Sequence, residues 1–149
     1  MSKETDIDTI GRLVAARDAA VANADAEAAL RPLARDVVVY DLLPPLAFVG
    51  DDARDAQALR ALAGHLEGTR STGRVPRVAD RGRWRPCRRV WLQPPAGGGD
   101  KIGEGPVELW FRTTLVFARS ADGWLVAHEH DSVPMEMDGS GLASVHLTP

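Results

Sequence analysis

In the N-terminal part of the chain, the hydrophobic residues have the spacing of an amphipathic helix. Apolar residues recur close to every 3.6 positions from about Thr5 to Ala22, which predicts a first helix. The polar stretch 23–25 interrupts it. A short second helix follows, and Pro32 is expected to kink it or end it early. The apolar positions that favour the two helices are Ile7, Ile10, Val14 and Val21 in the first, and Leu30 and Leu33 in the second.

A β-branched run and a third helix come next. Residues 37–41, VVVYD, predict a strand because β-branched side chains pack well on a pleated surface, and the rigid loop 43–45 closes it. Gly50 then leads to the pair Asp51-Asp52, which can cap a third helix. The leucines that would line one side of that helix are Leu59, Leu62 and Leu66.

Two long alternating strands end the predicted core. The first runs from Val107 to Phe117, Asp122-Gly123 supplies a turn, and the second runs from Trp124 to Asp131. Because helices come first and strands later, the order favours an α+β domain. One predicted face holds Phe111, Thr113, Leu115 and Phe117 with Leu125, Ala127, Glu129 and Asp131; the other holds Trp110, Arg112, Thr114 and Val116 with Trp124, Val126, His128 and His130.

Residues 69–99 do not fit this pattern. Eight of the 16 arginines lie between Arg70 and Arg89, where Asp80 is the only acid, and Pro, Gly and Trp are crowded there as well. Three interpretations remain open: a solvent-exposed Arg-rich loop or edge hairpin, an anion-binding patch, or a stretch translated from a shifted reading frame. Resequencing the gene tests the last of these.

The composition fits one globular domain and argues against one class of function, general nucleic-acid binding. At 149 residues and 44% hydrophobic content, the chain can bury a core of ordinary size. We expect one domain over 1–149, with a core over 5–135 and a flexible tail over 136–149. The formal charge of −3 and a pI near 5.8 argue against a general nucleic-acid binder, which would carry a basic excess.

Cysteine usage and hydropathy bear on the compartment. Cys87 is the lone cysteine, so no internal disulfide can form and nothing requires an oxidising compartment. No apolar run approaches the roughly 20 residues needed to span a bilayer. The polar, acidic N-terminus MSKETDIDTIG is unlike a signal peptide. We expect a soluble cytoplasmic protein without a membrane partner.

His128 and His130 share a face by alternation and could form an H-x-H metal pair. Zinc usually needs a third protein ligand, and no nearby cysteine or further histidine offers one, so no metal site is predicted. We expect the two histidines to join Trp110 and Arg112 in a polar cluster at an interface between two copies of the chain.

The helices, VVVYDLLPPLAFVG (37–50), LWFRTTLVF (109–117) and DGWLVAHEHDSVP (122–134) together resemble the SnoaL-like, ketosteroid-isomerase-like proteins of the nuclear transport factor 2-like superfamily. The match covers most of the chain except 69–99, where that family would place two more strands. The resemblance implies a cone-shaped α+β, cystatin-like fold, with three N-terminal helices packed on a curved antiparallel sheet over a deep pocket. It also implies homodimers formed through the sheet.

The resemblance also assigns site residues. Asp41 falls where ketosteroid isomerases carry their general base, and such a carboxylate can move a proton between carbons beside a carbonyl. The isomerase oxyanion hole is a tyrosine with a protonated acid. Here Arg17 and Thr113 stand at those positions, so steroid isomerisation proper is not expected. The other residues expected to contact the substrate are Glu129, Asp131 and Tyr40.

Simpler interpretations of the two acids stay open. Asp41 could bond to backbone amides of the Pro-Pro loop, as aspartates often do at turns. Asp131 could pair with solvent or an arginine near the end of its strand. Each would be a structural role without chemistry.

Two hypotheses about function follow. The first is a SnoaL-like enzyme, an isomerase or cyclase, that transfers protons on a small hydrophobic carbonyl compound without a cofactor, with Asp41 as base. The second is a non-catalytic ligand-binding or oligomerisation module. The association domain of calcium/calmodulin-dependent kinase has a similar strand pair and performs no reaction. Fold alone does not decide between them.

Overall fold

The computed structural model describes residues 5–63, 83–84, 87–92, 107–144 and 146–147. Side chains are described over the same ranges except at 62–63, 83–84, 87–92 and 107–110. Most of the Arg-rich segment 69–99, and Leu66 of the predicted third helix, therefore lie outside the described residues. The three interpretations of that segment stay predictions.

Helix α1 (Asp6–Ala22) confirms the first predicted helix, and Thr5 explains where it begins. The Thr5 hydroxyl accepts a hydrogen bond from the Asp8 N–H at 3.2 Å, and the Asp8 carboxylate accepts one from the Thr5 N–H at 3.3 Å. This reciprocal pair satisfies two backbone donors that the first turn leaves open. Asp25 caps α2 (Ala26–Leu30) with its side chain.

The third helix begins later than predicted. A 3-10 turn, η1 (Asp52–Arg54), comes first, and α3 (Ala56–Ala63) follows it. Asp55 is the cap, since its carboxylate accepts from the N–H groups two and three residues further on, at 2.8 and 3.2 Å. The predicted cap pair Asp51-Asp52 does not cap α3, because η1 begins there and moves the start of α3 along the chain, and Asp51 makes no capping hydrogen bond.

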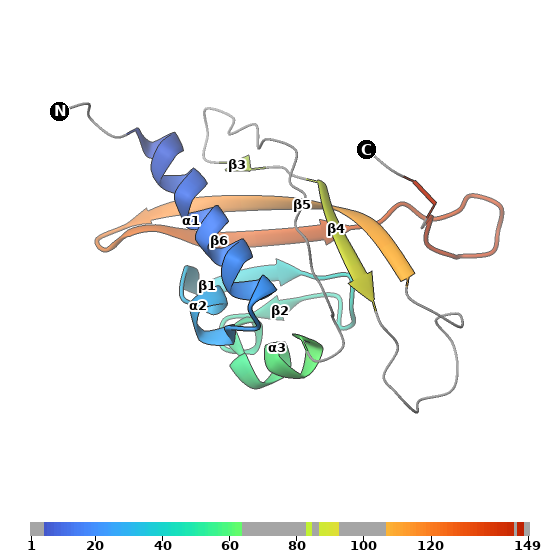
Figure 1. Cartoon of the computed structure of the whole chain (residues 1–149), viewed down its shortest axis with the longest axis horizontal. Helices are drawn as coiled ribbons and strands as arrows, with labels where there is room; N and C mark the ends of the chain where they lie inside the picture. The colour runs from blue at the N-terminus through green and yellow to red at the C-terminus, as the bar shows by residue number, and fades with distance from the viewer. Residues whose placement is uncertain (1–4, 64–82, 85–86, 93–106, 145, 148–149) are drawn as a thin grey trace.

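The strands among the described residues form one six-stranded sheet (Figure 1). Its order is β2-β1-β6-β5-β3, and β4 also pairs with β5. The α+β class is confirmed, but the sheet is mixed and not wholly antiparallel, because β1 and β6 run parallel. The strands are β1 (Leu33–Tyr40), β2 (Phe48–Val49), β3 (Arg83–Trp84), β4 (Cys87–Leu92), β5 (Val107–Ser120) and β6 (Gly123–Ser132).

The first long strand starts earlier than the sequence predicts. Helix α2 ends at Leu30, and Pro32 prevents it from continuing. Leu33, predicted to face inward from the second helix, is instead the first residue of β1, where it is buried. The register between β1 and β6 shifts between Leu33 and Val38, and two consecutive residues there, Arg35 and Asp36, are both exposed.

A β-bulge in β6 corrects the predicted faces of that strand. Val116 pairs with His128 and Phe117 with Val126, so Ala127 is the extra residue. The bulge reverses the alternation on its N-terminal side. Val126, predicted on the same face as His128 and His130, is therefore fully buried on the opposite face. From His128 to Asp131 the predicted alternation is confirmed.

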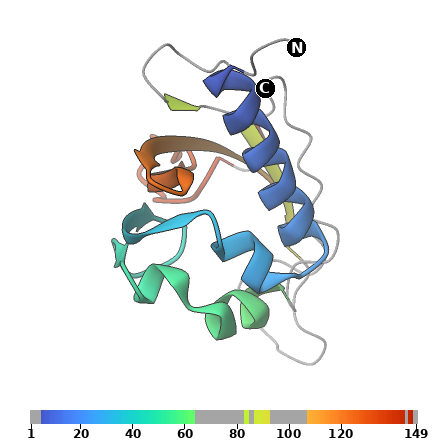
Figure 2. The same cartoon turned by 90° about the vertical axis from the view of Figure 1, so that its left-hand side faces the viewer.

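The core lies between the helices and one face of the sheet. Figure 2 shows α1 along one side of the β5–β6 hairpin, with α2 and α3 beside β1. We call the sheet face toward α1 the inner face and the opposite one the outer face. The buried apolar cluster consists of Ile10, Val14, Leu33, Ala34, Val37, Val39, Leu115, Phe117 and Val126.

The described residues after β6, 133–144 and 146–147, make backbone contacts with one another, and the flexible tail expected over 136–149 stays a prediction. Met135 and Ala143 form a β-bridge. The Glu136 N–H donates to the Leu142 carbonyl oxygen and the Ser144 N–H to the Pro134 carbonyl oxygen, each at 2.8 Å. These bonds close a loop that buries Ser144. Among the described residues, no helix is both long and apolar enough to cross a bilayer.

Candidate functional site

A buried ion pair joins α1 to β6 on the inner face. The Arg17 guanidinium donates to both oxygens of the Glu129 carboxylate, from Nη1 to Oε1 at 3.1 Å and from Nη2 to Oε2 at 2.6 Å. Its Nε donates to the Ala29 carbonyl oxygen of α2 at 3.2 Å. The two side chains are only 12% and 9% exposed. One guanidinium thus connects α1, α2 and β6.

The spacing of residues along α1 already indicates a buried, paired Arg17, which the expected oxyanion position did not take into account. Arg17 continues the apolar stripe of Ile10, Val14 and Val21 at helical spacing, so it points to the same side of α1 as core residues. A charge on a buried stripe needs a partner with the opposite charge. Glu129, predicted to face inward, is that partner.

The surroundings keep Arg17 ionised. Burial acts to lower its pKa, but neighbouring carboxylates outweigh that effect, and the pKa is raised above its ordinary value. Glu129 acts through both charge and hydrogen bonding, and Asp131 and Asp18 add smaller charge contributions. Asp18 was not predicted as a site residue, since nothing in its spacing marks it.

Thr113 places a hydroxyl on the inner face next to these charges. The residue is 1% exposed, and its Oγ1 has no hydrogen-bond partner in the structure as described. In the hairpin, Thr113 pairs in register with Asp131, and Leu115 with Glu129. A buried hydroxyl without a partner costs about 1–3 kcal/mol. The inner face therefore offers a hydrogen-bonding group that a bound oxygen atom could satisfy.

Asp41 lies at the end of β1, where the chain enters the loop with the cis Pro44–Pro45 bond. Its Oδ1 accepts a hydrogen bond from the Leu43 N–H at 3.1 Å, so the turn interaction is confirmed. Tyr40 pairs in register with His130. Asp41 is the next residue, so it lies close to the end of β6 that carries Asp131. The structure thus assigns Asp41 a role in the turn and leaves its catalytic role a prediction.

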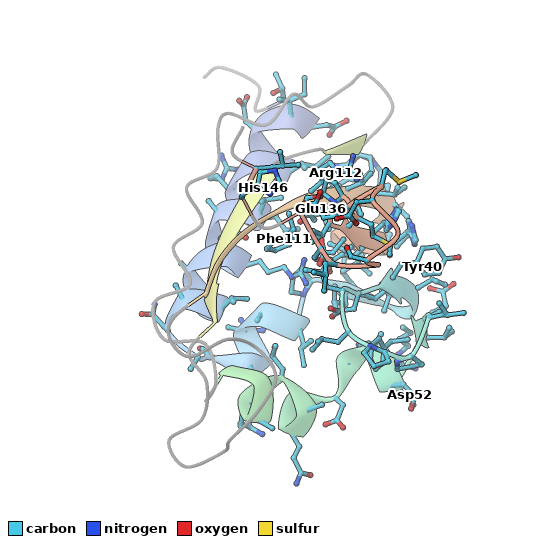
Figure 3. All side chains as sticks on the ribbon, turned by 90° about the vertical axis from the view of Figure 1, so that its right-hand side faces the viewer. Tyr40, Asp52, Phe111, Arg112, Glu136 and His146 are labelled. Carbon is cyan, nitrogen blue, oxygen red and sulfur yellow. The ribbon has the colours of Figure 1, made fainter. Side chains whose placement is uncertain are left out.

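Tyr40, His128 and His130 gather on the outer face. The Tyr40 ring lies edge-on to both imidazoles, with centroids 4.9 Å from His128 and 5.7 Å from His130. Figure 3 shows Phe111 toward α1 and Tyr40 on the side away from it. Tyr40, predicted to contact substrate together with Arg17, therefore lies on the opposite side of the sheet from that residue.

The outer-face residues differ in how they are held. His128 Nδ1 lies 2.8 Å from the Val38 carbonyl oxygen, which fixes the ring against β1. His130 and Arg112 are exposed. The Trp110 side chain, predicted in the same cluster, lies outside the described side chains. In the part of the chain that the structure describes, no group of three or more His, Cys, Asp or Glu residues could hold a metal ion.

Comparison with known proteins identifies the fold. No family model matches the chain, and no curated protein matches it. A solved structure of an NTF2-like protein of unknown function from Pseudomonas putida is 24% identical; the alignment covers 95% of this chain and 94% of that one, with a TM-score of 0.71. The chain therefore has the NTF2-like α+β fold that the resemblance implied.

Two further solved structures carry functional descriptions. A candidate dehydratase of the NTF2-like family from Streptomyces avermitilis is 18% identical over 85% of this chain and 95% of that one, with a TM-score of 0.66. A candidate association domain of calcium/calmodulin-dependent protein kinase II from Xanthomonas campestris is 14% identical over 92% and 94%, with a TM-score of 0.62. At these identities the likeness concerns the fold alone.

Proposed function

We propose that the protein is a cofactor-independent enzyme that transfers protons on a small hydrophobic carbonyl compound bound at the inner face. The observation that carries this proposal is the Thr113 hydroxyl, which is 1% exposed and has no hydrogen-bond partner among the described residues. It stands in register with Asp131, two pairs along the hairpin from the ion-paired Glu129, which lies on the same face. A substrate oxygen beside Thr113 would satisfy the hydroxyl and place the adjacent carbon close to carboxylates.

The chemistry assigned to the site is an allylic proton shift. Asp41 removes a proton from the carbon next to the carbonyl, and the C–H electron pair moves onto the carbonyl oxygen to form an enolate. The Thr113 O–H donates to that oxygen as its negative charge develops. Asp41 then returns the proton to a different carbon of the conjugated system, so the product is an isomer. No oxidant or reductant is consumed.

In this proposal Arg17 does not stabilise the enolate, although its sequence position corresponds to the oxyanion-hole tyrosine of the isomerases. Its guanidinium is bound by both Glu129 oxygens and the Ala29 carbonyl oxygen. We assign it a positioning role, in which it holds Glu129 and β6 and leaves a positive field beside Asp131. Asp131 then orients the substrate through its carboxylate.

The solved neighbours support the class of chemistry without defining the substrate. Dehydration of a β-hydroxy carbonyl compound also begins with removal of a proton beside the carbonyl. The candidate dehydratase and a ketosteroid isomerase-like protein from Erwinia carotovora atroseptica share this fold. A base with an oxygen-binding hydroxyl suits either outcome.

The proposal is tested by turnover of enones and β-hydroxy carbonyl compounds, compared between wild type and Asp41→Asn. The amide keeps an oxygen for the Leu43 N–H but cannot remove a proton, so we expect the variant to lose turnover. Asp36→Asn, an exposed aspartate of β1, is the matched control and should stay active. Equal turnover in wild type and Asp41→Asn would remove Asp41 from catalysis. Saturable binding without turnover would favour a ligand-binding module.

The exposed outer face supports a second proposal, that two copies of the chain associate through the sheet. Tyr40 is 43% exposed although its ring contacts two imidazoles. Aromatic side chains of this kind are enriched at protein interfaces. The association-domain neighbour has the same fold. Association and catalysis are compatible, because the two faces of the sheet are used separately.

A further inference from the structure

Arg54, in η1, has a partly enclosed guanidinium that makes no hydrogen bond with any described residue. Its Nε is buried and unpartnered in the described structure. Its Nη1 lies 3.8 Å from Asp51 Oδ1, which is too long for a hydrogen bond. Buried N–H groups are nearly always bonded to protein, water or a ligand. Arg54 therefore offers donors for a molecule that reaches it from solvent.

Arg54 lines an open cavity of about 560 Å³ together with Arg35, Gly50 and Asp51. A volume in the range of roughly 300–1,000 Å³ is usual for small-molecule sites. The irregularity in β1 explains how Arg35 comes there, since it exposes Arg35 and Asp36 in succession. Arg35 makes no ion pair with any described residue.

Gly50 also lines the cavity. Its φ of +59° turns the chain from β2 toward η1, and its N–H donates to the Val37 carbonyl oxygen at 2.9 Å. A Cβ at this position would lie 3.2 Å from the Arg35 carbonyl oxygen. The turn thus needs both the left-handed backbone and the missing side chain. It holds η1 against the irregular part of β1, so that Arg35 and Arg54 line one space.

We propose that this cavity binds the carboxylate of a small organic acid. Guanidinium groups present paired N–H donors that match the two oxygens of a carboxylate. Two arginines and one aspartate give the lining a net charge of one positive, which suits a monoanion better than a doubly charged phosphate. Asp51 is fully exposed and can turn to solvent when the ligand's oxygens approach Arg54. The site is separate from the inner face and does not depend on the proposed enzymatic function.

The test is a nitrogen-15 NMR titration with acetate and benzoate at constant ionic strength, with chloride as reference. We expect saturable shifts at the Arg54 Nε–H and the Gly50 amide. Arg35→Gln, which changes an exposed side chain, and Arg54→Met should each weaken the apparent affinity for the carboxylates at least tenfold. Asp51→Asn should strengthen it several-fold, because a competing carboxylate is removed. Arg60→Gln, which changes an exposed arginine that pairs with Glu27, should leave it unchanged.

Shifts that grow linearly without saturation, or that persist in Arg35→Gln, would overturn the site. The Arg35 variant decides this even if Arg54→Met does not fold. Tighter binding of inorganic phosphate than of either carboxylate would overturn the ligand class. Asp41→Asn should bind the carboxylates like wild type, and this separates the result from any failure of the proposed enzyme activity.

Discussion

Arg17 on α1 and Glu129 on β6 form a two-bond ion pair with N–O distances of 3.1 and 2.6 Å, and a third bond from Arg17 reaches the Ala29 carbonyl oxygen. The pair crosses from helix to sheet inside the apolar core. Burying two charges costs free energy because both lose their water. A guanidinium that donates to both carboxylate oxygens, as here, is the geometry that best offsets this desolvation cost. It also fixes the part of β6 that carries Asp131.

Glu129→Gln should destabilise the protein by about 3–5 kcal/mol, because it leaves the Arg17 charge buried without its counter-ion. The double variant Arg17→Met, Glu129→Leu removes both charges and should recover most of that loss. Urea unfolding measures both. Arg60→Gln breaks the exposed pair with Glu27 and should cost less than about 1 kcal/mol. Equal stabilities for Glu129→Gln and Arg60→Gln would contradict a buried, energetically coupled pair.

Thr113→Val should stabilise the unliganded protein by about 1 kcal/mol, because it removes an unsatisfied buried hydroxyl while keeping the branched shape. The same change should lower turnover if Thr113 donates to the developing enolate. Thr113→Ser keeps the hydroxyl and should retain activity at some cost in stability, since it removes a buried methyl group. Thermal unfolding and steady-state kinetics on the three proteins check this. A less stable but fully active valine variant would contradict both roles.

Asp41→Asn should lower turnover at least about 10²-fold, the usual contribution of a general base, while changing stability by less than about 1 kcal/mol. The turn is kept because the amide oxygen still accepts from the Leu43 N–H. Asp41→Ala loses that bond and should be less stable than Asp41→Asn. Comparison of kcat with the unfolding midpoint separates the catalytic part from the structural part. If both variants lose activity only in proportion to stability, Asp41 acts in the turn alone.

Local patterns predicted the elements of this fold well. The helical stripe of α1 and the alternation of β5 are periodic over many residues, so their type and inward faces were readable. The predictions are wrong where an extra residue shifts the alternation of a strand or an extra turn delays the start of a helix. Ala127 adds a position to β6 and brings Val126 into the core. Asp55, and not Asp51, caps α3, since the intervening 3-10 turn has no distinct sequence signal.

The candidate site was harder to predict because its geometry depends on long-range pairing. The strand alternation gave Thr113, Glu129 and Asp131 a common face, and the hairpin register confirms it. The bond between Arg17 and Glu129 spans 112 positions, and only the packing of α1 on the sheet brings them together. Tyr40, expected to contact the substrate, alternates away from Asp41 along β1, and the parallel register of β1 with β6 puts it beside His130.

Gly50→Ala should destabilise the protein by about 1–2 kcal/mol, because alanine is strained at a φ of +59° and its Cβ would approach the Arg35 carbonyl oxygen at 3.2 Å. Gly11→Ala is the matched control. Gly11 lies inside α1 with nothing within 4 Å of an added Cβ, so alanine there should stabilise by about 0.5–1 kcal/mol. Urea unfolding should give opposite signs for the two. Equal effects would contradict the tight turn at Gly50.

His130→Glu should weaken association of two copies at least tenfold, if the outer face is their interface. His130 is exposed beside Tyr40, and like charges brought together across a two-fold interface repel each other. Sedimentation equilibrium over a range of concentrations measures the dissociation constant. Arg31→Glu changes an exposed residue at the end of α2 and should leave association unchanged. A wild type that remains monomeric, or a His130→Glu variant that associates as tightly as wild type, would assign the outer face another role. Since the inner-face residues are untouched, turnover in the His130→Glu monomer also tells whether the site is complete in one copy of the chain.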